Sequence, residues 1–344
     1  MLAVNTTLVS VIIPCRNERG TIEGILESLR TQTYTGSFEV VIADGMSTDG
    51  TSEFVTKLIA SANYPFAVSV VQNEKQTIPS GLNTAVRAAR GDVIIRIDCH
   101  ARISEDYIEQ IVHALQQPNY DLVGPSIRII PGDASPMAEA ISILTASKLG
   151  SGGSASRTQI TSPVPVAHAA MSSYRRHVWE SLQGYDERLL TNEDFDFDYR
   201  ATQLGLGVYS LPQPTFYTMA RPTLTALAKQ RWRYGWWKAA VLAKYPRSLH
   251  VRQAIPMLVL IALTVLVVTS MVNQSVVEPL LYLVYVYTAI CAMSALHTLS
   301  TLSSVVGGLR TAVTTLVLAP VIYAVIHGLW AAGAVAGLVG NRRL

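Results

Sequence analysis

The sequence predicts an α/β domain, with a mixed and mainly parallel sheet flanked by helices, followed by a C-terminal region of transmembrane helices. Three observations support this fold class. Strand-like runs alternate with helical patterns through residues 8–130, polar clusters follow the strand-like runs, and charged residues nearly vanish after residue 252. Of the 344 residues, 49% are hydrophobic and 15% are charged, a balance too apolar for an ordinary soluble enzyme.

The first part of the chain alternates between two kinds of pattern. Short runs of β-branched and apolar residues predict strands at residues 8–14, 38–43, 68–72, 92–97 and 122–130. Apolar residues at helical spacing predict helices at residues 18–32, 52–62, 79–89 and 105–116. Strands that alternate with helices form a parallel sheet with right-handed crossovers.

Polar clusters follow three of the predicted strands. They are Arg16-Asn17-Glu18, Asp44-Gly45 and Asp98-Cys99-His100. Because parallel strands place their ligand-binding loops along the carboxyl edge of the sheet, these residues predict a site at that edge. A later stretch rich in Gly and Ser, residues 150–161, is predicted to be a mobile loop over a site.

The C-terminal region carries almost no charge. Between Gln253 and Asn341 the only charged residues are Glu278 and Arg310. Three apolar segments, at about residues 254–272, 279–299 and 311–339, approach the roughly 20 residues that cross a bilayer core of about 30 Å. Three such runs rarely occur together in a soluble fold, so we predict membrane helices. Pro320 leaves open a broken or re-entrant third helix.

Basic residues cluster just before the first apolar segment, where cytoplasmic anionic head groups would meet them. They are Lys229, Arg231, Arg233, Lys238, Lys244, Arg247 and Arg252. The connection at residues 273–278 has no Lys or Arg, whereas the next contains Arg310, which favours a cytoplasmic N-terminal domain. Arg342 and Arg343 oppose this pattern, because three spans would leave them outside.

Other global features agree with a membrane-bound protein that faces the cytosol. We see no signal peptide, and three scattered cysteines suit a reducing compartment. A net charge of +3 is too small to indicate nucleic-acid binding. We predict a cytoplasmic domain at residues 1–222, amphipathic interfacial helices at 223–252 and a transmembrane region of about three helices at 253–344. The predicted location is the inner membrane, in contact with its lipids.

Three segments resemble a known family. VSVIIPCRNE, VIADGMSTDGT and GLNTAVRAARGD look like the nucleotide-binding half of glycosyltransferase family 2, which has the GT-A fold, and the resemblance covers residues 9 to about 238. It implies a nucleotide-sugar donor, for which UDP-glucose is the first candidate. By the same resemblance, Pro14, Arg16 and Glu18 line a uridine pocket, Asp44 bonds the nucleobase, and Asn83 joins the donor-binding residues.

A metal-binding pair is implied at residues 98–100. Departure of a nucleoside diphosphate needs a counter-charge, which a divalent cation often supplies. Asp98 and His100 fall where the family has its D-x-D motif, and a subgroup similar to the succinoglycan-pathway glucosyltransferase has such a D-x-H. An imidazole suits Mn²⁺ better than Mg²⁺, or it contacts the diphosphate directly. The alternative is that Asp98 is only a helix-capping or turn residue after a strand.

An acidic cluster at residues 191–200 offers a catalytic base. Crowded carboxylates repel one another, which raises the pKa of at least one and suits it to proton abstraction. The alternative is an acidic first turn stabilised by the helix dipole. By resemblance to the family's E-D motif, Asp194 is the base, Glu193 and Asp196 support it, and Asp196 is the second candidate base. His168 is equally open to a catalytic role and to a place in the core.

Residues 229–234 resemble the Q-x-x-R-W motif of membrane-bound members, with Tyr234 in place of the tryptophan. The resemblance implies that Gln230 and Arg233 bind the donor, with Arg233 holding the departing diphosphate. Aromatic residues among basic ones also indicate a helix that lies in the head-group layer. Both roles are compatible with one segment.

Together these features predict an inverting glycosyltransferase that uses a UDP-sugar and Mn²⁺ or Mg²⁺. Its predicted acceptor is a lipid-linked oligosaccharide at the cytoplasmic membrane face, in exopolysaccharide or cell-envelope synthesis. Two alternatives remain open on the sequence: a processive polysaccharide synthase, for which three spans are few, and a membrane-anchored scaffold that binds a nucleotide-sugar without turnover.

Overall fold

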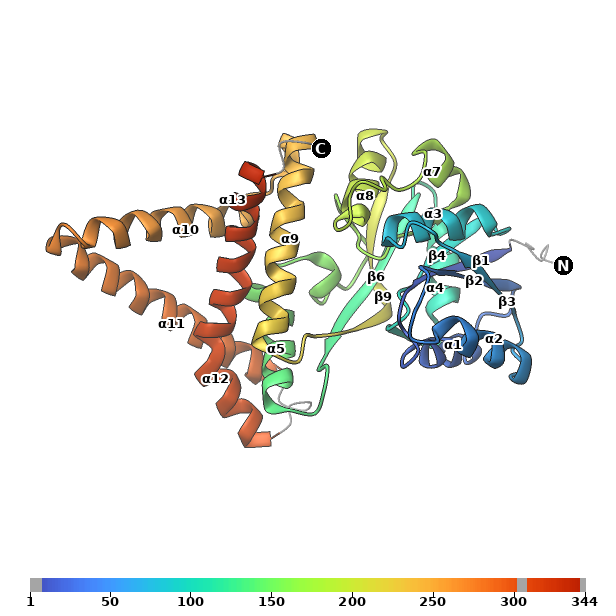
Figure 1. Cartoon of the computed structure of the whole chain (residues 1–344), viewed down its shortest axis with the longest axis horizontal. Coiled ribbons are helices and arrows are strands. Elements are labelled where there is room, and N and C mark those ends of the chain that lie inside the picture. Colours follow the sequence, from blue (N-terminus) through green and yellow to red (C-terminus); the bar gives the residue numbers. More distant parts are fainter. Residues whose placement is uncertain (1–7, 302–307, 341–344) are drawn as a thin grey trace. The chain divides into compact units, whose positions relative to one another are not determined.

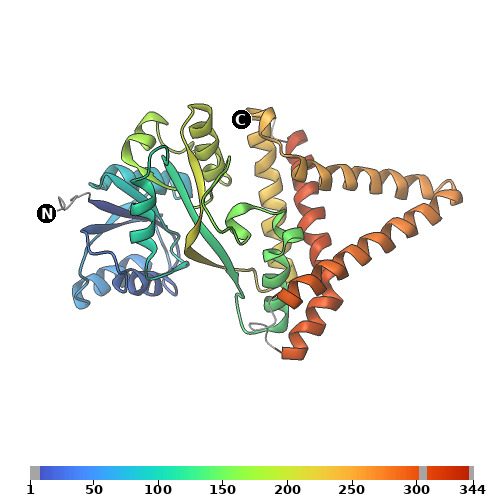
Figure 2. The ribbon, with the colours of Figure 1, turned by 180° about the vertical axis from the view of Figure 1, so that it is seen from behind.

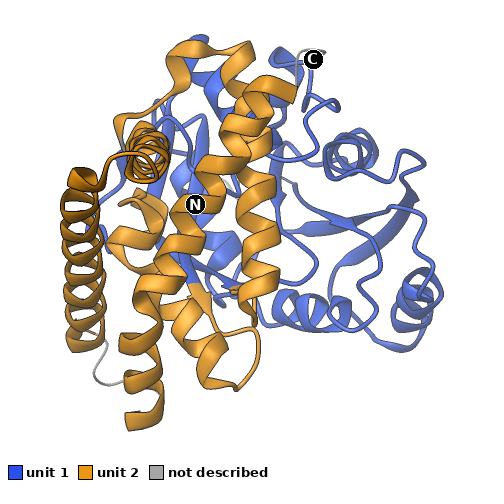
Figure 3. Cartoon of the chain, turned by 60° about the vertical axis from the view of Figure 1, so that its left-hand side comes forward, with its two compact units in different colours: residues 1–128, 159–218 blue, residues 129–158, 219–344 orange. Residues whose placement is uncertain are grey.

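The computed structural model describes residues 8–301 and 308–340. Within them the chain divides by its internal contacts into two compact units, shown in two colours in Figure 3. Unit 1 comprises Met1–Arg128 and Gln159–Thr218, and unit 2 comprises Ile129–Thr158 and Met219–Leu344. This division groups an early helical segment with the C-terminal helices. The predicted boundaries at residues 222 and 252 concern placement in the membrane and stay a prediction.

Unit 1 is built on a mixed sheet, which has nine strands among the described residues, in the order β3-β2-β1-β4-β8-β6-β9-β5 with β7 beside β9. The strands are β1 (Val9–Cys15), β2 (Phe38–Asp44), β3 (Ala67–Gln72), β4 (Val93–Arg96), β5 (Arg102–Ile103), β6 (Leu122–Ile130), β7 (Val164–Pro165), β8 (Ser173–Arg175) and β9 (Val208–Met219). Strands β1 to β4 are parallel, and β8 runs antiparallel to β4 and β6. The predicted fold class is confirmed.

Helices cover both faces of this sheet because the parallel strands alternate apolar side chains between the two faces. Along β1, Val11 and Ile13 pack into one core with α1 (Ile22–Arg30) and α4 (Tyr107–Leu115), whereas Ile12 packs into the other. That second core contains residues of α3 (Ile78–Ala88), α7 (Arg176–Ser181) and α8 (Glu193–Gln203). Helices α1 and α2 (Thr51–Ser61) lie on the side of the sheet opposite α3 (Figures 1 and 2).

The strand predictions are confirmed to within two residues, and one helix start is corrected. The prediction began the first helix at residue 18, but α1 begins at Ile22. Residues 17–21 form a turn instead, in which Asn17 takes a φ of 56° and the carbonyl of Glu18 accepts bonds from the amides of Thr21 and Ile22. The turn keeps Arg16 and Glu18 on a loop at the carboxyl edge, where their side chains are available for a ligand.

Unit 2 is helical in its described residues, with 3-10 turns at η1 to η3 and a π-helical turn at η4. Its elements are α5 (Pro136–Ala146), α6 (Lys148–Ser151), η1 (Ala155–Arg157), α9 (Leu224–Lys244), η2 (Pro246–Ser248), α10 (Val251–Ser270), η3 (Gln274–Val276), α11 (Val277–Thr301), α12 (Gly308–Ala324), η4 (Val325–Leu329) and α13 (Trp330–Gly340). The segment 150–161 contains the end of α6 and the turn η1, in which Ser156 is buried, and its predicted mobility stays a prediction.

Three helical stretches of unit 2 are long and apolar enough to cross a membrane. They are Gln253–Ser270, Gln274–Thr301 and Gly308–Gly340. Helices α10 and α11 leave large apolar side chains exposed, including Leu258 at 64% and Leu281 at 62%. A surface of this kind is unfavourable in water and is matched by lipid chains. The third stretch changes from α12 to α13 through the π-helical turn η4, which begins five residues after Pro320.

Helices α9 and α13 lie side by side in unit 2 and approach so closely that only glycine fits at their contact (Figures 1 and 2). A Cβ added to Gly235 of α9 would lie 1.9 Å from the carbonyl oxygen of Trp330. From the other side, a Cβ on Gly333 would lie 2.3 Å from the carbonyl oxygen of Trp232, and one on Gly337 would lie 2.7 Å from that of Trp236. Small residues allow this backbone contact, as in packed membrane helices.

Candidate active site

The loops that follow β1 and β2 lock together at the carboxyl edge of the sheet. The amide of Gly45 donates to the carbonyl of Cys15 at 2.7 Å, and the amide of Thr48 donates to Oδ1 of Asn17 at 2.8 Å. Asp44, at the end of β2, is buried and accepts a hydrogen bond from Ser47 Oγ at 2.5 Å. The structure therefore brings together the predicted donor-binding residues of these two loops, Arg16 and Asp44.

The loop after β4 joins the same edge. Nδ1 of His100 lies 3.1 Å from Oε1 of Glu18, so the predicted metal-binding and nucleotide-binding loops meet directly. Burial opposes ionisation of Glu18, but hydrogen bonds from His100 and Thr21 outweigh it and lower the pKa of Glu18 below its ordinary value. Asp98 is partly exposed, and its Oδ1 lies 3.4 Å from Nη2 of Arg96.

These side chains fit a cation that is shared with a diphosphate. Within residues 8–301 and 308–340, no group of three or more His, Cys, Asp or Glu residues is placed to hold a metal ion. Asp98 and His100 still offer a carboxylate oxygen and an imidazole nitrogen, donors that Mn²⁺ accepts. Two protein ligands leave most coordination positions to phosphate oxygens and water, as is usual for metals bound with nucleotides. The donor set suits a cation that arrives with its nucleotide.

A buried arginine connects this edge to the acidic cluster. Nη2 of Arg96 lies 3.0 Å from Oε1 of Glu193, besides its contact with Asp98, and the arginine is only 4% exposed. Burial opposes its charge, but the nearby carboxylates outweigh this and raise the pKa of Arg96 further above its ordinary value. Arg96 was not among the residues predicted from the sequence. The available signal was a basic residue inside the otherwise apolar strand β4.

The acidic residues at the start of α8 differ in their solvent exposure. Asp194 is 26% exposed in its side chain, whereas Glu193 is buried. Asp196 is completely buried and accepts a hydrogen bond from Nε of Arg200 at 2.8 Å. Of the three predicted carboxylates, Asp194 is thus the one that a substrate hydroxyl can reach, which favours it over Asp196 as the base.

His168 lies between two carboxylates of α8. Its Nδ1 is 2.8 Å from Oδ2 of Asp198, and its Nε2 is 3.8 Å from Oδ2 of Asp194. Asp198 is fully buried and also accepts from the amide of Ala169 and the hydroxyl of Ser172. With all these donors on Asp198, the imidazole is held with Nδ1–H donated to it and Nε2 turned toward Asp194. The sequence analysis missed Asp198, although it lies one helical turn after Asp194.

The pKa values of the adjacent residues Glu193 and Asp194 are shifted in opposite directions. Burial raises the pKa of Glu193 to about 7, against the pull of Arg96 and with the help of Asp194. For Asp194, burial is outweighed by the attraction of His168 and Arg96, so its pKa is lowered. The crowded cluster was predicted to raise at least one pKa, and Glu193 shows that shift, whereas Asp194 stays ionised.

The raised pKa of Glu193 predicts a dependence of stability on pH. Its carboxyl binds more protons in the folded state than in the unfolded state between the ordinary value of 4.5 and about 7, so the free energy of unfolding falls as the pH rises through this window. We expect the melting temperature to fall less steeply over this window in Glu193→Gln, which cannot titrate. Thermal unfolding in a pH series measures both slopes, and equal slopes would contradict the assignment.

The contacts described above do not include three of the predicted site residues. Asn83 is buried and bonds the backbone of Tyr185 and the side chains of Trp179 and Glu187, which anchors a neighbouring loop. Gln230 and Arg233 lie on α9 in unit 2, where Nε2 of Gln230 donates to the hydroxyl of Tyr234 at 3.3 Å and Arg233 is exposed. Their roles in donor binding stay predictions.

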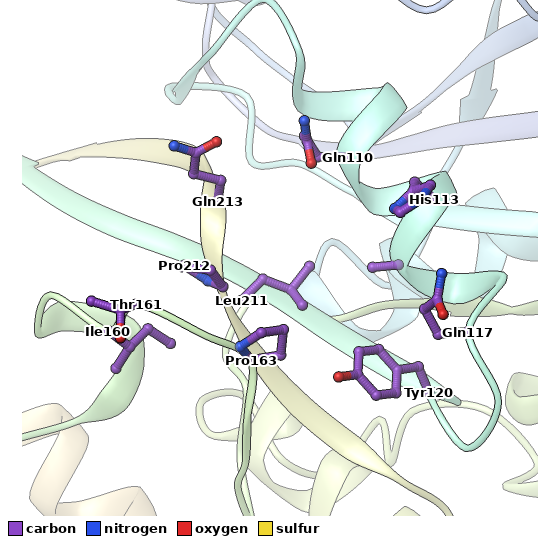
Figure 4. Close-up of a pocket in the computed structure, with 11 residues that line it drawn as sticks. Gln110, His113, Gln117, Tyr120, Ile160, Thr161, Pro163, Leu211, Pro212 and Gln213 are labelled. Atoms are coloured by element: carbon purple, nitrogen blue, oxygen red, sulfur yellow. The ribbon is translucent and has the colours of Figure 1, made fainter.

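A cavity of about 760 Å³ lies elsewhere in unit 1 (Figure 4). One side of this cavity is lined by α4 and the residues after it, which contribute amide, imidazole and phenol groups. The other side is lined by apolar residues of β9 and of the segment 160–163. None of the predicted site residues lines it. The predicted site residues at the edge of the sheet therefore do not line this cavity.

Comparisons with known proteins identify the family of the chain. A family model described as Glycosyl transferase family 2 matches residues 10–182. The succinoglycan biosynthesis protein ExoA of Rhizobium meliloti (strain 1021) is 32% identical over 72% of this chain and 74% of its own length. A dolichyl N-acetyl-α-D-glucosaminyl phosphate 3-β-D-2,3-diacetamido-2,3-dideoxy-β-D-glucuronosyltransferase of Methanococcus voltae is 26% identical over 69% of this chain and 74% of its own length.

The solved structure of the mannosyltransferase PcManGT from Pyrobaculum calidifontis, in complex with GDP-Man and Mn²⁺, superposes with a TM-score of 0.59 at 19% identity. The match covers 99% of this chain and 89% of that one. The mixed sheet with polar loops at its carboxyl edge is the GT-A fold, and the protein is a glycosyltransferase. The chain belongs to glycosyltransferase family 2.

Proposed function

We propose that the protein is an inverting glycosyltransferase that moves a sugar from a UDP-sugar, with UDP-glucose the first candidate, to a lipid-linked oligosaccharide at the cytoplasmic face of the inner membrane. The observation that carries the proposal is the position of Asp194. It is the one partly exposed carboxylate among the three predicted at the start of α8, and Glu193 and Arg96 connect its helix to Asp98 at the carboxyl edge of the sheet. The names of the two relatives, which concern succinoglycan and a dolichyl-linked sugar, support such an acceptor.

In the proposed reaction Asp194 takes the proton of the acceptor hydroxyl. The hydroxyl oxygen forms a bond to the anomeric carbon while the bond from that carbon to the diphosphate breaks, and the electron pair leaves with UDP. One displacement inverts the anomeric configuration. A divalent cation, when bound at Asp98 and His100, neutralises charge on the departing diphosphate.

The residues around Asp194 hold its carboxylate in position for this role. His168, held by Asp198, keeps its Nε2 3.8 Å from Oδ2 of Asp194, where the ring in its protonated form stabilises the ionised carboxylate by its charge. Arg96 bonds Glu193, the residue directly before Asp194, and so holds the first turn of α8 in place. These residues position the base, and none of them needs to contact the acceptor.

A donor panel tests the proposal. The purified full-length protein, in detergent with a bacterial lipid extract and Mn²⁺ or Mg²⁺, is expected to release UDP from one UDP-sugar much faster than from the others. Omission of the lipid extract, with the other components unchanged, controls for hydrolysis of the donor. Nucleotide binding without release from any donor would contradict the proposal and favour a scaffold, whereas a long polymer as product would favour a processive synthase.

A further inference from the structure

Unit 2 contains a buried arginine that has no role in the proposed reaction. Arg231 of α9 is 8% exposed, and its Nε is buried without a hydrogen-bond partner. Among the residues that the structure describes, none forms an ion pair with it. A buried charge without a partner is strongly unfavourable, so such a group in a native protein indicates a ligand of opposite charge.

A second positive charge in unit 2 makes this position less favourable for a lone cation. Burial and the positive charge of Arg157, on η1, together lower the pKa of Arg231 to about 10. Three acidic residues belong to the described part of unit 2, and none of them pairs with Arg231: Asp133 bonds Ser135, Glu139 bonds Thr311, and Glu278 lies in the first turn of α11 and forms no ion pair with Arg231. Arg231 and Arg157, both residues of unit 2, add positive charge to the same region, which attracts an anion.

The helical segment that packs against α9 beside Arg231 has an unusual backbone. Arg231 lies one turn before Gly235, so both residues face the same side of α9, the side on which Gly235 contacts Trp330. The π-helical turn η4, directly before Trp330, packs against α9. Single π-helical turns are rare and occur often at functional sites. The close glycine contacts of α9 with α13 hold η4 and α13 rigidly against α9.

We propose that Arg231 and Arg157 bind the phosphate or diphosphate that joins a lipid-linked acceptor to its polyprenyl chain. Guanidinium groups bind phosphate oxygens in pairs, and they do so most strongly where water is excluded. Unit 2 also contains the apolar helices beside which a lipid chain would lie. The choice of a lipid-linked acceptor rests on the proposed function, whereas the anion site itself rests on the unpartnered guanidinium. Arg233, which the family resemblance assigns to the donor diphosphate, is exposed and is a different residue.

Direct binding of a soluble probe tests the site. Radiolabelled farnesyl diphosphate is titrated against the full-length protein in neutral detergent, with saturating UDP present to block the donor site. We expect Arg231→Gln to weaken binding at least tenfold and Arg157→Gln to weaken it severalfold. Lys229→Gln removes an exposed positive charge from the same helix, two residues away, and should change binding less than twofold. Unchanged affinity in Arg231→Gln would overturn the proposal.

A phospholipid head group offers the same phosphate chemistry and must be distinguished. Phosphatidylglycerol is therefore added as a competitor at the concentration of the probe. Little displacement is expected, because a lipid-linked diphosphate carries more charge. Displacement by equal amounts of phosphatidylglycerol would assign the site to membrane lipid and overturn the acceptor assignment.

The melting temperature is a second measurement, and it distinguishes a ligand-binding arginine from a purely structural one. Removing an unpartnered buried charge should raise the melting temperature of the unliganded protein in Arg231→Gln, while the probe no longer raises it further. A lower melting temperature without ligand would mark Arg231 as a structural residue and overturn the proposal. Probe binding that depends on Arg231, in a protein that releases UDP from no donor, would reject the proposed function and leave the anion site standing.

Discussion

Replacing Asp194 with asparagine is expected to lower the rate of sugar transfer about a thousandfold, within the range of roughly 10²–10⁴ that a general base contributes. The amide has nearly the same shape but cannot take a proton. Asp194 is the exposed carboxylate of its cluster, and its lowered pKa keeps the wild-type side chain ionised at neutral pH. UDP release measured with the preferred donor gives the rate, and UDP affinity should be unchanged because Asp194 acts on the acceptor.

The control for this substitution is Asp133→Asn, which makes the same chemical change at an exposed residue of unit 2. It should keep the wild-type rate. If Asp194→Asn retained more than about a third of the activity, the base would be another group. His168 would then be the next residue to replace, because its Nε2 lies 3.8 Å from Asp194.

The second large effect is expected at Arg96. Arg96→Gln leaves the buried carboxylate of Glu193 without its cation, and breaking a buried ion pair from one side costs about 3–5 kcal/mol. We expect a clear loss of stability in denaturant unfolding. The rate of UDP release should also fall at temperatures where the variant stays folded, because the first turn of α8 is no longer fixed to β4.

A double variant separates the ion pair from other causes. In Arg96→Gln/Glu193→Gln no ionised carboxylate is left at position 193, so most of the lost stability should return. Arg188→Gln is the surface control, since Arg188 pairs with Asp186 in an exposed position, where such pairs contribute about 0–1 kcal/mol. A double variant as unstable as Arg96→Gln alone would show that the pair with Glu193 is not the reason for the loss.

The sequence predicted the sheet well because buried parallel strands leave a strong local signal. Residues 8–14 and 38–43 are mostly apolar and β-branched, and the structure contains the parallel strands β1 and β2 at these positions. The start of α1 was predicted four residues early, because a turn stabilised by backbone bonds to Glu18 leaves no mark in hydrophobic periodicity. The grouping of residues 129–158 with the C-terminal helices depends on contacts between distant segments, which no local pattern reveals.

The candidate site was predicted in part. Asp98, His100, Glu18 and Asp194 were chosen from motifs, and the structure places them at one edge of unit 1. Arg96 could not be chosen in this way, since its contact with Glu193 joins residues 97 positions apart. The pairing of His168 with Asp198 likewise follows only from the packing of a loop against α8.

The glycine contact between α9 and α13 has a consequence for how many times the chain crosses the bilayer. Helices whose backbones touch along several turns occupy the same depth, and α9 exposes Lys229, Arg233 and Lys244, which the hydrocarbon core disfavours. We therefore expect this helix pair to lie at head-group level, which leaves the hairpin of α10 and α11 to cross. An even number of crossings returns the chain to its starting side, so that α9 and α13 would lie on the same side of the bilayer.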